Sequence, residues 1–148
     1  MKPMNACRLA LALGLAGTAL VAAADECLPK VEQGWVRSPP VAMPMMAGFA
    51  RIENPCAAPV AVVSASSLSF AEVSIHETRE IDGVNRMREV ERLEVAAGGL
   101  VELKPGGLHL MLYRPQTALK EGDKLSIALK LADGREIAGE FEVRKPKP

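Results

Sequence analysis

Residues 104–112 read KPGGLHLML, a turn followed by a run in which leucine alternates with histidine and methionine. Successive side chains of a β-strand point to opposite faces, so the three leucines share one face and His109 and Met111 share the other. The leucines are suited to a hydrophobic core. The stretch therefore predicts a strand whose outward face carries His109 and Met111 together.

Short runs rich in Val, Ile and Leu recur on both sides of this stretch, separated by turn signals such as Asp82-Gly83 and Asp133-Gly134. Such punctuation is typical of an all-β sandwich or barrel. The clearest hairpin joins the last two runs through Asp133-Gly134. We expect strands near residues 34–38, 47–54, 59–67, 71–77, 85–90, 100–104, 108–113, 124–131 and 135–143.

Residues 1–24 have the features of a secretory signal peptide. Lys2 and Arg8 form a positive start, Leu9 to Val21 an apolar stretch, and Ala22-Ala23-Ala24 a cleavage site of small residues. Cleavage after Ala24 would leave residues 25–148 as one exported domain. Cys7 precedes the apolar stretch, where it cannot serve as a lipidated N-terminal cysteine.

The exported part of the chain would carry 16 basic and 18 acidic residues, because the leader removes two cations and no acids. A formal charge of about −2 argues against nucleic acid and against a polybasic membrane contact. The basic end at residues 144–148 is most simply a solvated, proline-stiffened tail. Two cysteines remain, Cys27 and Cys56, and in an exported protein a disulfide is the default pairing, with two free thiols as the alternative.

The chain has only two histidines, and a methionine accompanies each of them. Strand alternation places His76 with Glu72 and Ser74 on a polar face, so it does not resemble a core histidine. Met87 lies between two arginines without a local packing partner. Imidazole nitrogen and thioether sulfur form a soft, neutral ligand set that favours copper(I), and copper(I) binding is the leading hypothesis.

The spacing His76-x10-Met87-x21-His109-x-Met111 resembles the signature of PCuAC-type periplasmic copper chaperones. The surrounding stretches are also similar to that family: residues 34–37, 47–54, 75–78 and 103–112. The resemblance covers nearly all of residues 28–143. It implies a cupredoxin-like Greek-key β-sandwich or barrel that binds one Cu(I) through His76, Met87, His109 and Met111.

The same resemblance implies a partner and a destination for the copper. These are the copper-bearing subunit of cytochrome c oxidase, whose binuclear centre would receive the metal, and a Sco-type thioredoxin-like copper protein. We expect a monomer. Two positions depart from the family pattern: Glu77 stands where some relatives have a methionine, and the C-terminal tail lacks the His and Met residues that some relatives use for copper(II).

Other functions fit the sequence less well. A blue-copper site needs a cysteine thiolate, and no cysteine is near His109. Catalysis by a histidine general base lacks a recognisable motif, so we expect a binding protein rather than an enzyme. A periplasmic copper buffer or resistance protein would use the same four ligands and stays open. Met43, Met45 and Met46 are expected to fill the core or contact a partner rather than bind metal, and Trp35 to pack in the core or at an edge.

Overall fold

The computed structural model describes residues 26–146, which form ten β-strands and no helix. The signal peptide and the cleavage site expected at residues 1–24 lie outside the described residues. Between residues 26 and 146 there is consequently no helix long and apolar enough to span a membrane. The strands are β1 (Lys30–Arg37), β2 (Met45–Glu53), β3 (Val60–Ser66), β4 (Phe70–Ile81), β5 (Val84–Glu89), β6 (Leu93–Val95), β7 (Leu100–Leu103), β8 (Leu108–Pro115), β9 (Lys124–Leu131) and β10 (Glu136–Arg144).

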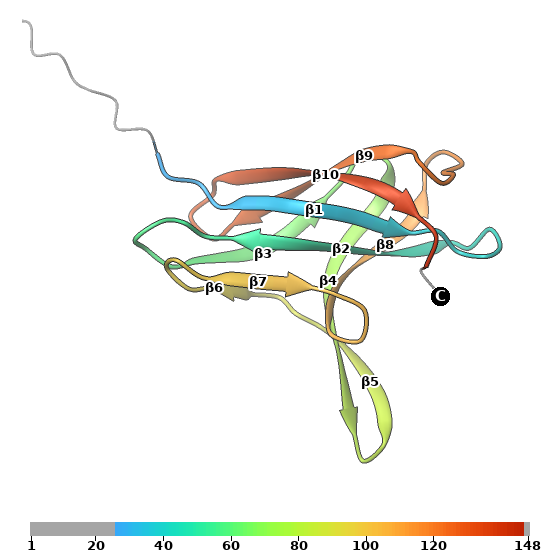
Figure 1. Ribbon diagram of the computed structural model, residues 1–148, viewed down its shortest axis with the longest axis horizontal. Helices are drawn as coiled ribbons and strands as arrows, with labels where there is room; N and C mark the ends of the chain where they lie inside the picture. The colour runs from blue at the N-terminus through green and yellow to red at the C-terminus, as the bar shows by residue number, and fades with distance from the viewer. Residues whose placement is uncertain (1–25, 147–148) are drawn as a thin grey trace, which may run out of the picture.

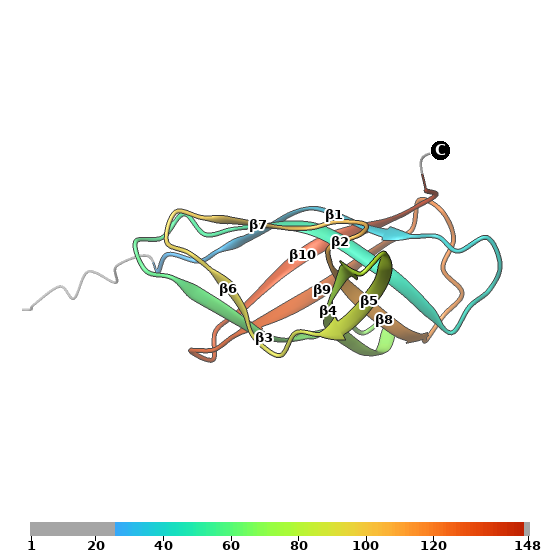
Figure 2. The same ribbon diagram turned by 90° about the horizontal axis from the view of Figure 1, so that it is seen from below.

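Seven of these strands close into a barrel in the order β4-β8-β2-β1-β10-β9-β3, and a β3–β4 pairing completes the ring (Figures 1 and 2). Every pair in the ring is antiparallel except β1 with β10. The short strand β6 pairs with β3, the short strand β7 pairs with β2, and β5 pairs with β4 in a hairpin. The all-β prediction is confirmed.

Alternating apolar residues fill the inside of the barrel. Leu110 and Leu112 of β8 have no exposed surface, and Ile75 of β4 is almost as deeply buried. On β9 and β10, every second residue is buried, so the two strands of the Asp133-Gly134 hairpin contribute one face each. Burial of this kind is the main stabilising contribution to the fold.

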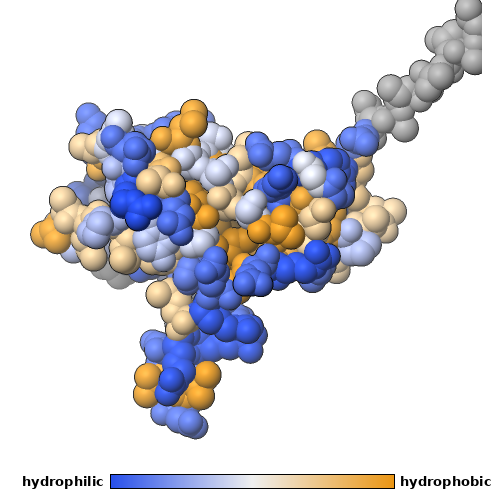
Figure 3. Space-filling view, turned by 180° about the vertical axis from the view of Figure 1, so that it is seen from behind, coloured by the Kyte–Doolittle hydropathy of each residue, from blue (hydrophilic) through white to orange (hydrophobic). Residues whose placement is uncertain are grey.

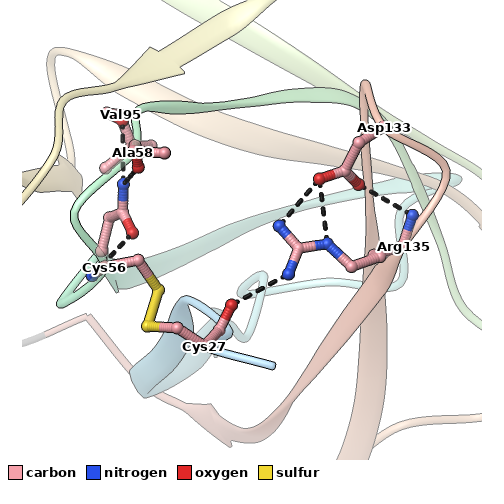
Figure 4. Close-up of polar contacts among 7 residues, drawn as sticks. Cys27, Cys56, Ala58, Val95, Asp133 and Arg135 are labelled. Atoms are coloured by element: carbon pink, nitrogen blue, oxygen red, sulfur yellow. Dashed lines mark hydrogen bonds and ion pairs between the residues drawn. A yellow bond between two sulfur atoms is a disulfide. The ribbon is translucent and has the colours of Figure 1, made fainter. Parts of the chain in front are cut away.

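The predicted disulfide is present and links the segment before β1 to the loop after β2. Cys27 and Cys56 are bonded, with 29 residues of sequence separation, and Arg135 donates a hydrogen bond to the Cys27 carbonyl at 2.9 Å while pairing with Asp133 (Figure 4). Asn54, which is 1% exposed, stabilises the same loop through hydrogen bonds. Its side-chain amide donates to the carbonyl oxygens of Ala58, Val95 and Ala96 and accepts from the Cys56 N–H.

The β4–β5 hairpin projects beyond the barrel (Figure 1). Its turn residues Asp82 and Gly83 have φ values of 53° and 74°, the conformation of the tight two-residue turns that match strand twist. All six residues of β5 are exposed. A space-filling view shows the hairpin as a charged arm with apolar atoms toward its end, where Ile81 and Val84 are exposed (Figure 3).

Two strand boundaries differ from expectation by four residues and one strand was not expected, each for a local reason. β1 begins four residues earlier than expected, at Lys30, because a bulge with Gln33 at φ 55° interrupts the alternation that would have shown it. β4 continues to Ile81 because the exposed arm needs no apolar pattern. β6, Leu93–Val95, was not expected because three residues are too short to show a period.

Candidate metal centre

The strand register brings the four candidate ligands to one face of the sheet. His76 of β4 lies directly opposite His109 of β8, and Met111 of β8 lies opposite Ser74 of β4. Met87 of β5 lies opposite Thr78, two residues from His76. Directly paired residues and residues two apart share a face in a pleated sheet, so the four side chains lie together on the outside of the barrel.

His109 and Met87 are in contact. The His109 Nδ1–H donates to the Gly107 carbonyl at 2.9 Å. This hydrogen bond assigns the tautomer protonated at Nδ1, in which Nε2 carries a free lone pair. The Met87 sulfur lies 3.2 Å from this Nε2. A thioether has no hydrogen to donate, so two electron-pair donors face each other at this point. Such a pair is suited to a shared cation.

His76 lies across the strand pair, with its ring centroid 6.1 Å from that of His109. Its Nε2 is 2.9 Å from the Ser74 hydroxyl, and its Nδ1 is buried with no hydrogen-bond partner among the described residues. Burial lowers the pKa of His76, and His109 adds to the lowering, while Glu89 opposes it. This lowering favours the neutral ring, the form in which an imidazole binds a metal.

His109 and Met111 are less open to solvent than the sequence predicted. They point away from the leucine core as expected, but they are only 7% and 8% exposed. His109 is covered by Met87 from β5 and neighboured by the Phe49 ring of β2 at 6.5 Å. The alternation within β8 could not reveal this cover because it comes from other strands. Met87 itself is 54% exposed and closes the site on its solvent side.

Glu77, the residue at the departure from the family pattern, points away from this face. Strand alternation sends it to the opposite side from His76, where it pairs with Arg79 at 2.8 Å and Arg88 at 2.9 Å. These hydrogen bonds, with Arg79 first, lower the pKa of the Glu77 carboxyl. Glu77 is thus a structural ion-pair residue of the β4–β5 hairpin.

A row of aromatic side chains leads to the site, and the sequence did not predict this connection. Trp35 packs on Phe49 with ring centroids 4.5 Å apart, which fits the edge-packing role predicted for Trp35, and Phe49 leads on to His109. The Arg37 guanidinium lies over the Phe49 ring at 5.1 Å. Phe49 and the Gly107 carbonyl are the neighbours that sequence reasoning missed, although Phe49 lies within a stretch already noted as similar to the family.

The other methionines have different environments. Met46 is buried in the barrel core, which confirms the core-filling expectation for that residue. Met43 and Met45 are partly exposed beside the loop before β2. Within residues 26–146, His, Cys, Asp and Glu side chains form no cluster of three that could hold a metal. The strongest candidate centre in this part of the chain is therefore the mixed histidine and methionine set.

Comparisons with known proteins agree with this fold. The LpqE-like family model, described as "Putative lipoprotein LpqE-like", matches residues 30–143. Lxx21020 of Leifsonia xyli subsp. xyli, which bears the same kind of description, is 31% identical over 133 residues, covering 84% of this chain and 79% of the relative.

Solved structures with the same architecture include PCuAC domains. The apo PCuAC domain from PmoF1 superposes with a TM-score of 0.66 at 21% identity, covering 80% of this chain and 94% of that domain, which shows the shared fold. DR1885 from Deinococcus radiodurans is 25% identical. Its apo form has a TM-score of 0.63, covering 99% of this chain and 97% of that one. Its CuI form has a TM-score of 0.62, covering 86% and 83%.

Proposed function

This chain belongs to the LpqE-like family and shares the cupredoxin-like fold of PCuAC domains, and from this premise we propose that it is an exported copper(I) carrier. His76, Met87, His109 and Met111 would hold one ion as cargo. The observation that carries the proposal is the 3.2 Å contact between the His109 Nε2 lone pair and the Met87 sulfur. A nitrogen and a sulfur donor this close together, both neutral, can contact the same soft monovalent cation.

The ligand chemistry fits copper(I) better than other common metals. Two thioethers and two imidazoles contribute no negative charge, so hard ions such as Mg²⁺ and Ca²⁺ would lack the oxygen donors they require. Thiolates would also bind copper(I), but the two cysteines of the described chain are bonded to each other. The CuI form of DR1885, a structure 25% identical to this chain, supports the same cargo.

The site is built for release as well as for capture. Met87 is more than half exposed and is held on a projecting hairpin, so a partner could replace this ligand first. Because none of the four ligands is charged, the bound ion would be released to a partner more readily than from a thiolate site. We propose that the recipient is the binuclear copper centre of cytochrome c oxidase, with a Sco-type protein as a second partner. Transfer would take place in the periplasm, to which the signal peptide expected at residues 1–24 would direct the chain.

A copper transfer assay tests this function. The copper(I)-loaded domain would be mixed under anaerobic conditions with the metal-free soluble domain of the oxidase subunit, and metal on each protein measured after separation. We expect copper on the oxidase domain faster than from a copper(I)-chelator complex of equal affinity. Transfer no faster than from that chelator would contradict delivery and favour a copper buffer.

A further inference from the structure

A hollow lies near the candidate metal centre. It has a volume of about 470 Å³ and is lined by Trp35, Arg37, Pro105, Arg144, Lys145 and Pro146. Three of these residues are cationic and none is acidic. The basic end of the chain, expected to be solvated, thus contributes Arg144, Lys145 and Pro146 to a wall.

The cations of this hollow are unequally neutralised. Arg144 pairs with Glu142 at 3.0 Å and Lys145 with Glu121 at 3.0 Å. Arg37 forms no ion pair with any described residue, and its buried Nε has no hydrogen-bond partner there. A guanidinium left in this state has unused donors, and an unpaired buried donor is unfavourable. The hollow therefore borders one cation that no described carboxylate neutralises, and an anion placed in it would meet this charge.

The hollow is connected to the metal centre in two ways, each through one intervening residue. Trp35 on its wall packs on Phe49, which neighbours His109. Pro105 belongs to the same turn as Gly107, whose carbonyl accepts the His109 Nδ1–H. A group held in the hollow would lie beside the strand that carries His109 and Met111.

We propose that this hollow docks an acidic segment of the protein that exchanges copper with the site, an inference that rests on the proposed function. A carboxylate matches the planar fork of a guanidinium, and the indole and proline walls suit the aliphatic part of glutamate. The chain after the leader has a net charge of about −2, whereas the lining of the hollow has no acidic residue and includes Arg37 without a carboxylate partner, so this wall would orient an acidic partner.

Intrinsic fluorescence provides a direct readout because Trp35 is the only tryptophan of the chain. The metal-free domain would be titrated with a hexaglutamate peptide and, separately, with a hexaglutamine peptide. We expect a saturable change with hexaglutamate alone, weakened by salt. Arg37→Gln should lower the affinity on the order of tenfold, as expected for one charge-assisted contact. Arg86→Gln, an exposed arginine of β5, is the matched control and should not change it.

Lys145→Gln serves as a second variant on the exposed side of the wall, should Arg37→Gln fail to fold, and should also weaken binding. No saturable response, or equal responses in wild type and both wall variants, would overturn the proposal. Citrate binding as tightly as hexaglutamate would overturn the assignment to a peptide. Because the titration uses metal-free protein, its failure is separate from failure of copper binding, which Arg37→Gln should retain in a one-to-one ratio.

Discussion

The two thioethers of the candidate centre differ in burial, and this difference predicts stability losses of very different size when they are truncated. Met87 is 54% exposed, so Met87→Ala should change the free energy of unfolding of the metal-free domain by no more than about 0.5 kcal/mol. Met111 is 8% exposed, so Met111→Ala should leave a cavity and cost about 2 to 5 kcal/mol. Met111→Leu keeps the volume without the sulfur and should cost less than about 1.5 kcal/mol.

Urea unfolding of the four metal-free proteins measures these differences, with the slope m used to check that each variant unfolds in the same way. The reasoning would be refuted by a cost below about 1 kcal/mol for Met111→Ala, or by a cost above about 2 kcal/mol for Met87→Ala. The result also sets the design of copper experiments. A leucine at either position removes a ligand without removing the packing, so a loss of copper binding can be assigned to the sulfur.

Three further outcomes are expected. Copper(I) affinity should fall as pH decreases, because a protonated imidazole cannot bind metal. Burial holds the pKa of His76 below its ordinary value, so the contribution of His76 should be lost only below about pH 6.5. A competition series between pH 8 and 5 checks this, and a flat affinity would argue against histidine ligands. Replacing Cys27 and Cys56 by serine should lower the free energy of unfolding by about 3 to 4 kcal/mol, because the disulfide closes a loop with a sequence separation of 29 residues. The folded variant should keep its copper affinity. A loss below about 1 kcal/mol in urea unfolding would contradict this prediction. Glu77→Met should not raise copper(I) affinity, since this position points away from the centre, and a gain of tenfold or more in the competition assay would show that the hairpin rearranges.

Much of the site followed from local alternation along single strands. The parity of β4 and β8 predicted that His76, His109 and Met111 point away from the core, and the structure agrees. The position of Met87 was also accessible, because a two-residue turn at Asp82-Gly83 fixes the pairing of β4 with β5 and places Met87 near His76.

The remaining features depend on contacts between distant strands. The register of β8 against β4 joins residues about 33 positions apart, and no turn chemistry fixes it. The cover over His109 needs β2 and β5 as well as β8. The basic wall needs the end of β10 beside β1, a parallel pair that joins the first and last strands of the chain. These arrangements come from closure of the barrel, which leaves no local mark in the sequence.

Anaerobic copper(I) competition against a chromogenic chelator tests the central claim most directly. The domain and its Met87→Leu, Met111→Leu double variant would be compared, since both should be folded and differ at the two sulfurs. We predict tight one-to-one binding in the first protein and a collapse of affinity in the second. Equal affinity in the two proteins, or no competition by the unmodified domain, would contradict a copper site at His76, Met87, His109 and Met111.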